Sequence, residues 1–407
     1  MPNTIKIHRI LYLLISGFMV IHGALHDEAA AGPQMTFGPN NEGTLQIDYK
    51  GQFQTIVRDT GSGPNGDDTT SQFNFRRNRL AFMGQYGEAM SLYVQTEFTE
   101  DQNISAVGVN DTSESSEFQV LDAVLRFTIN DALRINVGKF KYNLSRENLE
   151  DCFAPLTLDR SLFIRAPMVT TRDKGVAIWG NLMGGLLQYR IDAMNGRLPV
   201  TADAPEPESN FRYSARLHVS LLDPENEYGY KGTYLGKKKV LTIGAALQRE
   251  ANVAYADTLL MSGPVSYSGT AVDVFYEHPV GEAGAITLSG AYEKIDLDDA
   301  YKGANPDPGT TGLNGEKNGS YAKIGYLLPG GALQFFGRYE KWSFASLQDV
   351  ADQKVLWTAG GLNYYIRGQN LKFTLEYSKT DFDKEGVFNG TTSKDFSTTI
   401  AQLQVVF

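Results

Sequence analysis

The feature that most constrains this chain is an alternation of apolar and polar residues with a period of two. It is clearest in the last segment, where Phe407, Val405 and Leu403 are separated by Gln404 and Gln402. Such a pattern gives a β-strand one apolar and one polar face. A strand at the end of a chain leaves an unpaired sheet edge unless the sheet closes on itself. The pattern therefore favours a closed transmembrane β-barrel, with the edge strand of a soluble β-protein as the alternative.

The same alternation recurs along the chain and predicts sixteen strands. Their lengths, near ten residues, suit a tilted crossing of a membrane. An even number of strands also places both chain termini on the periplasmic side. The predicted strands are 43–57, 71–86, 90–100, 117–129, 132–141, 173–183, 185–194, 210–222, 238–249, 266–278, 283–295, 318–328, 331–343, 354–367, 369–380 and 394–407.

The connections between these strands alternate between short and long. Short glycine-rich or Asn-Asp turns occur at 87–89, 130–131, 184–185, 330–331 and 368–370. The long connections are 58–70, 101–116, 142–172, 195–209, 250–265, 296–317, 344–353 and 381–393. Only 223–237 is long where a short turn is expected. Long loops on one rim and short turns on the other are typical of an outer-membrane barrel.

Aromatic residues near strand ends suggest a girdle at the lipid headgroups. A general preference of aromatic residues for strands is the alternative. The residues concerned are Tyr142, Tyr326, Tyr339, Trp342, Tyr364 and Tyr365.

The first residues differ from the rest of the chain. Lys6 and Arg9 precede an apolar run over 10–21, and three alanines follow at 29–31. This order is typical of a secretory signal peptide, and the apolar run is too short to span a bilayer as a helix. We therefore expect a signal peptide over 1–31 and an outer-membrane barrel domain over 32–407, in a Gram-negative bacterium.

Composition excludes several other functions. The net charge of −10 makes the chain a poor partner for nucleic acid. Cys152 is the single cysteine, and beyond the predicted signal peptide the histidines are His218 and His278. These residues predict neither a metal site nor a cofactor. A Ser-His-Asp hydrolase would need a serine beside a histidine, and the sequence gives neither histidine such a partner, so we expect no enzyme.

The third long connection, 142–172, is unusually apolar for a loop. Its apolar residues are Leu144, Leu149, Phe153, Leu156, Leu158, Leu162, Phe163 and Ile164. We expect it to fold inward against the barrel wall and to narrow the water-filled lumen of a sixteen-stranded barrel. Its arginines, suited to phosphate and carboxylate oxygens, would then lie at the constriction: Arg146, Arg160, Arg165 and Arg172. The alternative is that they only pair with nearby carboxylates, namely Glu147, Glu150, Asp151, Asp159 and Asp173.

Four segments resemble the phosphate-selective porin O/P family. They are residues 73–80 (FNFRRNRL), 137–141 (VGKFK), 158–162 (LDRSL) and 234–244 (YLGKKKVLTIG). The resemblance implies a trimeric, sixteen-stranded outer-membrane porin whose anion path is lined by arginines and lysines of the Arg-Arg strand and the inward loop. On this chain it assigns to that path Arg76, Arg77, Arg79, Lys141 and the loop arginines.

Strand parity places eight arginines on the lumen face: Arg77, Arg79, Arg126, Arg134, Arg190, Arg212, Arg216 and Arg338. Acidic residues share the same face, so the lining is mixed: Glu97, Asp122, Asp192, Asp273, Glu277, Glu340 and Glu376. We expect a channel for passive diffusion of small hydrophilic solutes, with preference for anions of the phosphate or polyphosphate class. Its expected partners are outer-membrane lipid, lipopolysaccharide and two further copies of the chain. A weakly selective general diffusion porin and a closed structural or adhesive barrel remain the alternatives.

Overall fold

The structure is a computed structural model that describes residues 32–60, 69–99, 117–161, 164–197, 210–312, 315–345, 352–384, 386–388, 391–393 and 395–407. The predicted signal peptide lies outside these residues, as do Leu162 and Phe163 of the third loop.

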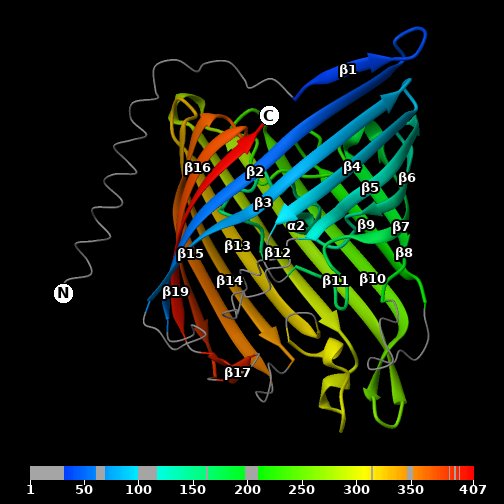
Figure 1. Cartoon of the computed structure of the whole chain (residues 1–407), viewed down its shortest axis with the longest axis vertical. Coiled ribbons are helices and arrows are strands. Elements are labelled where there is room, and N and C mark those ends of the chain that lie inside the picture. Colours follow the sequence, from blue (N-terminus) through cyan, green and yellow to red (C-terminus); the bar gives the residue numbers. More distant parts are fainter. Residues whose placement is uncertain are drawn as a thin grey trace, which may run out of the picture.

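Most of the described strands form one closed antiparallel barrel, and β17 and β18 form a separate hairpin (Figure 1). Sixteen strands, β2 to β16 and β19, each pair with the next, and the pairing of β19 with β2 closes the wall. The strands are β1 (Gln34–Phe37), β2 (Gly43–Thr60), β3 (Thr69–Tyr86), β4 (Met90–Thr99), β5 (Glu117–Asn130), β6 (Leu133–Phe140), β7 (Asp173–Leu182), β8 (Leu187–Met194), β9 (Arg212–Ser220), β10 (Val240–Asp257), β11 (Ser262–Pro279), β12 (Ala285–Asp296), β13 (Lys317–Leu327), β14 (Leu333–Phe344), β15 (Gln353–Arg367), β16 (Leu371–Phe382), β17 (Gly386–Phe388), β18 (Thr391–Ser393) and β19 (Phe396–Val406). Each of the sixteen predicted strands is therefore confirmed.

Helical structure is confined to short turns in the described residues. They are α2 (Arg146–Leu149), η2 (Met183–Gly185), η3 (Gly281–Ala283), η4 (Ala300–Lys302) and η5 (Pro308–Thr310). No helix in the described part of the chain has the length and apolar character needed to cross a bilayer.

The period-two alternation sorts side chains between the two faces of the wall. On β11, Val272 and Val274 are 55% and 45% exposed on the outside, whereas Asp273 between them is 4% exposed inside. Apolar residues on the outer face suit lipid, and polar residues on the inner face suit a lumen. The predicted aromatic girdle is only partly correct. Tyr326 and Tyr339 are exposed outside, but Tyr142, Trp342 and Tyr365 are buried.

The last residue helps to close the barrel. The Phe407 amide donates to the Tyr49 carbonyl at 3.0 Å, and the Tyr49 amide donates to the Phe407 carbonyl at 2.7 Å. The two rings lie 5.3 Å apart. Phe407 thus extends the β19–β2 seam by one residue pair, near the rim that carries the C-terminus in Figure 1.

One predicted long loop is wrong. Residues 250–265 belong largely to β10 and β11, which continue as a hairpin in which Ala254 pairs with Val265 and Asp257 with Ser262. A bulge between Glu250 and Ala254 shifts the register there. That shift breaks the period-two pattern on which the sequence prediction depended, so the continuing strands could not be recognised.

Two connections fill the middle of the barrel. The connection 141–172 between β6 and β7 is called loop three below, and its described residues contact the inner face of the wall: the Leu158 amide donates to Glu376 at 3.1 Å and the Arg146 amide to Asp273 at 3.0 Å. From the opposite rim, residues 221–239 between β9 and β10, called the β9–β10 connection below, meet this loop. The Asp151 amide donates to the Tyr230 carbonyl at 2.8 Å.

Candidate functional site: the arginines around loop three

A β-bulge in β3 places two neighbouring arginines inside the barrel. Gln52 of β2 is opposite Arg77, but Phe53 is opposite Phe75, so Arg76 is an extra residue in the ladder. A bulge of this kind redirects a side chain that would otherwise point to the opposite face. Arg76 and Arg77 consequently reach the same carboxylate, Asp159 of loop three.

Asp159 joins loop three to the wall. Its carboxylate lies 2.8 Å from Arg76 Nη2 and 2.9 Å from Arg77 Nη2. Burial raises the pKa of Asp159, but the positive charges of Arg77 and Arg76 outweigh burial and hold the pKa well below its usual range. One carboxylate therefore faces two guanidinium groups, and the cluster carries a surplus of positive charge.

Three loop-three arginines form contacts that hold the loop in place. Arg146 pairs with Glu225 of the β9–β10 connection at 2.6 Å, and Arg172 pairs with Asp122 of β5 at 2.9 Å. Arg160 donates to the carbonyls of Glu147 and Asn148 at 3.0 and 3.1 Å. All three side chains are buried. The alternative expectation paired these arginines with carboxylates of the loop itself, but Arg146 and Arg172 pair with carboxylates outside it. Asp159 of the loop pairs with the wall residues Arg76 and Arg77 instead.

The other predicted residues lie apart from Asp159. Arg79 pairs with Glu97 at 2.7 Å, and Arg134 pairs with Asp131 at 2.7 Å at the short-turn rim. Arg126 lies over the Tyr93 ring, with 5.4 Å between its guanidinium carbon and the ring centroid. Lys141 donates to the Glu150 carbonyl, and burial lowers the pKa of Lys141 to about 7. Arg165 is partly buried in loop three.

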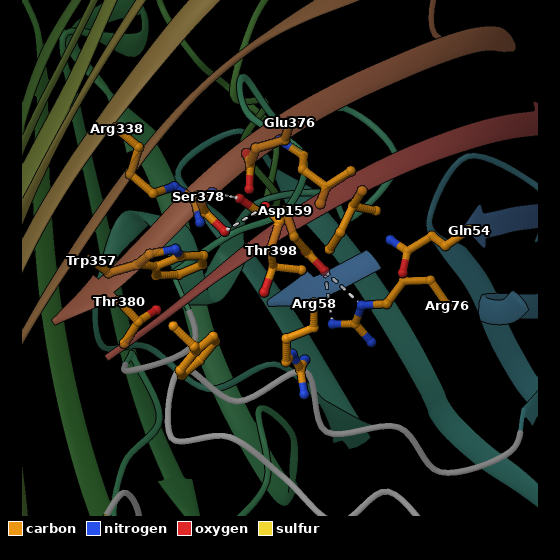
Figure 2. A pocket seen from close by; sticks show the side chains of 13 residues that line it. Gln54, Arg58, Arg76, Asp159, Arg338, Trp357, Glu376, Ser378, Thr380 and Thr398 are labelled. Carbon is orange, nitrogen blue, oxygen red and sulfur yellow. Dashed lines mark hydrogen bonds and ion pairs between the residues drawn. The ribbon is translucent and has the colours of Figure 1, made fainter. Parts of the chain in front are cut away.

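A small hollow lies between loop three and the wall (Figure 2). Arg76 lies on one side and Arg338 on the other, with Asp159 and Glu376 between them. The complete lining is Gln54, Arg58, Arg76, Leu158, Asp159, Arg338, Trp357, Glu376, Ser378, Thr380, Phe396, Thr398 and Ile400. Of the residues predicted for an anion path, the hollow includes Arg76 and none of the loop-three arginines.

Sequence reasoning missed several of these residues. Arg58, Trp357 and Phe396 line the hollow but were not singled out. Their position at the long-loop ends of β2, β15 and β19 was the available signal. The role of Glu225 was also missed, although the unusual length of its connection was noted.

His218 has a serine neighbour, contrary to expectation. Its Nε2 lies 3.2 Å from Ser220 Oγ and its Nδ1 lies 2.9 Å from Tyr230 Oη. His218 and Ser220 are 2% and 4% exposed, and Tyr230 belongs to the β9–β10 connection. The contacts therefore secure that connection to β9, and the serine is not accessible to a substrate. The described residues contain no cluster of His, Cys, Asp and Glu side chains that could hold a metal ion.

Solved structures share the architecture at low sequence identity. An anion-selective porin from Comamonas acidovorans aligns with a TM-score of 0.57 at 10% identity, covering 90% of this chain and 100% of that one. The outer membrane channel DcaP of Acinetobacter baumannii gives 0.54 at 14% identity, covering 92% and 100%. The loop L8 deletion mutant of OmpT, an outer membrane protein of Vibrio cholerae, gives 0.52 at 12% identity, covering 90% and 100%. At these identities the likeness establishes the fold alone.

Among curated proteins, no match to the chain was found. The sequence profile of phosphate-selective porin O and P matches residues 47–407, which is nearly all of the barrel. The chain therefore belongs to the phosphate-selective porin O and P family and is an outer-membrane β-barrel porin, a channel and not an enzyme.

Proposed function

We propose that this porin passes small hydrophilic anions, of the phosphate or polyphosphate class, by a narrow path between loop three and the wall formed by β2, β3, β14 to β16 and β19. The observation that carries the proposal is the sharing of one carboxylate, Asp159, by Arg76 and Arg77. Arg76 remains 19% exposed at its side chain and lines the hollow with Arg58 and Arg338. Positive groups lining a pore favour anions.

The path is proposed to be narrow because loop three and the β9–β10 connection occupy the middle of the barrel. Arg146 and Arg172 would then act on the path indirectly, by holding loop three in position. The predicted contributions of Arg160, Arg165, Lys141, Arg79, Arg126 and Arg134 remain proposals of the same kind.

The test is a reversal potential in a potassium chloride gradient across a planar bilayer. We expect the native channel to prefer chloride, and added phosphate to reduce the chloride current. Arg76→Gln should weaken both effects, because it removes a positive charge from the lining.

Arg249→Gln is the matched control, because Arg249 is exposed on β10 between the buried Gln248 and Glu250 and does not line the hollow. Cation preference of the native channel would contradict the proposal. Equal effects of the two substitutions would place the selective charge elsewhere.

A weakly selective general diffusion porin is the second candidate. Charged groups of the lumen neutralise each other in pairs: Arg79 with Glu97 at 2.7 Å, Arg216 with Asp273 at 2.6 Å and Arg212 with Glu250 at 2.6 Å. If such pairs dominated, chloride and potassium would permeate almost equally and phosphate would not block.

We also propose that the mature chain begins after residue 31 and assembles as a homotrimer in contact with lipid and lipopolysaccharide. Exposed apolar residues on the outer wall, such as Leu247 and Val272, support a lipid-facing surface. N-terminal sequencing of the outer-membrane protein would test the cleavage position. The mass of the detergent-solubilised assembly would test the trimer.

A further inference from the structure

The hollow beside loop three has two chemically different sides. Trp357, Phe396, Leu158 and Ile400 supply an apolar side. Arg76, Arg338 and Arg58 supply three cationic groups, which outnumber the two carboxylates of the lining, Asp159 and Glu376. A site for a fully hydrated inorganic anion would gain nothing from the apolar side chains. A concave lining that combines apolar surface with a few polar groups is instead typical of sites for organic molecules.

Arg338 has unused capacity to donate a hydrogen bond. Its side chain is buried, and its Nη2 donates to Thr157 Oγ1 and to the Asp159 carbonyl. Its Nη1 is buried without a hydrogen-bond partner among the described residues. The guanidinium already has a charge partner, since Arg338 Nε lies 3.5 Å from Glu340 Oε1. A buried donor without an acceptor is nevertheless costly, so an acceptor from a ligand at Nη1 would be favoured.

The same guanidinium lies beside an aromatic ring. The Arg338 guanidinium carbon is 4.2 Å from the centroid of the Trp357 ring. Figure 2 shows Trp357 and Arg338 on one side of the hollow and Arg76 on the other, with Asp159 between them. A ligand that fills the space would therefore meet an indole ring and cationic groups at the same time.

A second polar atom also lacks a partner. Gln54 Nε2 donates to Gln402 Oε1 at 2.7 Å, but Gln54 Oε1 is buried without a hydrogen-bond partner among the described residues. Gln54 lines the hollow close to Arg76 (Figure 2). A hydroxyl on the ligand could donate to this oxygen.

We propose that the hollow binds a small organic anion that carries a ring, of the aromatic carboxylate class. Its carboxylate accepts hydrogen bonds from Arg338 Nη1 and Arg76, and its ring packs against Trp357 and Phe396. This goes beyond the proposed function, on which it depends for a route through the barrel, because an aromatic carboxylate is a different class of anion from phosphate. Binding can nevertheless be measured without any conduction.

The experiment is isothermal titration calorimetry of the purified full barrel with benzoate, and separately with inorganic phosphate. We expect benzoate to bind more tightly than phosphate. Trp357→Leu should weaken benzoate binding by about five-fold while leaving phosphate unaffected, since it removes the aromatic partner of the ligand ring. Arg338→Gln should weaken benzoate binding further.

Trp179→Phe is the matched control, because Trp179 belongs to β7 and its indole donates to Asn136 instead of lining the hollow. It should leave benzoate binding unchanged. Only variants that keep the heat-modifiable band of the folded barrel on a gel are compared. If Arg338→Gln does not fold, Trp357→Leu alone provides the test.

Two results would overturn the inference: benzoate binding no tighter than phosphate, or benzoate binding that Trp357→Leu leaves intact. Neither result would contradict an anion preference measured in the bilayer. Conversely, cation preference in the bilayer together with tight, Trp357-dependent benzoate binding would refute the proposed selectivity while supporting the site.

Discussion

Arg146 of loop three and Glu225 of the β9–β10 connection form an ion pair of 2.6 Å in which the two side chains are 1% and 2% exposed. A second bond joins Arg146 Nη2 to Glu225 Oε1 at 2.7 Å. The Arg146 guanidinium carbon also lies 3.9 Å from the centroid of the Phe275 ring. The pair links a loop that enters from one rim to a connection that enters from the other, so it holds both in the middle of the barrel.

Replacing Glu225 by Gln should loosen this link. It leaves Arg146 buried without its charge partner, and breaking a buried pair in this way costs about 3–5 kcal/mol. We expect a lower unfolding temperature and a larger single-channel conductance, because the β9–β10 connection loses an anchor. Glu227→Gln is the control, because Glu227 lies exposed in the same connection, and it should change neither the unfolding temperature nor the conductance. An unchanged conductance in the Glu225 variant would show that the connection does not limit the path.

Replacing Asp159 by Asn should increase anion preference. The substitution removes the carboxylate shared by Arg76 and Arg77 and leaves both positive charges at the hollow. The reversal potential should shift toward the equilibrium potential of chloride, and phosphate should block the chloride current at lower concentration. A shift toward potassium would mean that Arg76 and Arg77 do not face the conducting path.

The same carboxylate should contribute to acid sensitivity. The pKa of Asp159 in the folded protein lies below its ordinary value, so its contribution to stability is present above that ordinary value. The contribution is lost as the pH falls through the folded pKa. The wild type should therefore lose more unfolding free energy than Asp159→Asn on strong acidification, as followed by the folded band after incubation at each pH.

Anion preference should fall as the pH rises from about 6 to about 9. Burial lowers the pKa of Lys141 to about 7, and burial, with the charge of Glu147 next in weight, raises that of Glu150 to about 8. Loop three thus loses a positive charge and then gains a negative charge over this range. Reversal potentials measured at successive pH values should show the change. Glu150→Gln should abolish the part of the change that occurs at the higher pH values.

The two groups act oppositely on stability, so the reversal potential is the more informative measurement. The depressed pKa of Lys141 gives stability above its ordinary value of 10.5, which is lost as the pH falls through about 7. The raised pKa of Glu150 gives stability below its ordinary value of 4.5, which is lost as the pH rises through about 8. A preference for anions that did not change with pH would show that neither group influences the path.

Deleting Phe407 should reduce insertion into the outer membrane. The deletion removes two backbone hydrogen bonds to Tyr49 and a ring contact at 5.3 Å. Such a ring contact contributes about 0.5–1.5 kcal/mol beyond its buried area. Phe407→Tyr keeps the ring and the backbone and should assemble normally. The amount of heat-modifiable barrel in the outer-membrane fraction measures the effect, and full assembly of the deletion variant would contradict it.

The wall of the barrel could be predicted from the sequence because its two faces meet different surroundings. On β11, for example, Val272 and Val274 are exposed on the outside, and Asp273 between them is buried inside. We expect loop three to fold inward for the same reason, since Leu144, Leu156 and Leu158 have no use in a loop exposed to water, and these three residues are buried here.

The details of the candidate site could not be predicted because they depend on register and on contacts distant in sequence. Parity alone places Arg76 outside and Arg77 inside, and only the bulge opposite Gln52 brings both inside. Similarly, no local pattern indicates that Glu225 meets Arg146, which is 79 positions away. Whether Arg160 and Arg165 contribute to an anion path stays a prediction.

The side chains of Gln52 and Gln404 are joined by a hydrogen bond of 2.7 Å although 352 positions separate them in the chain. This seam means that the cylinder cannot exist until the final strand has been delivered. The wall therefore stays open until β19 is available to pair with β2. Because these two edges are so remote along the chain, their pairing should form more slowly than that of neighbouring strands.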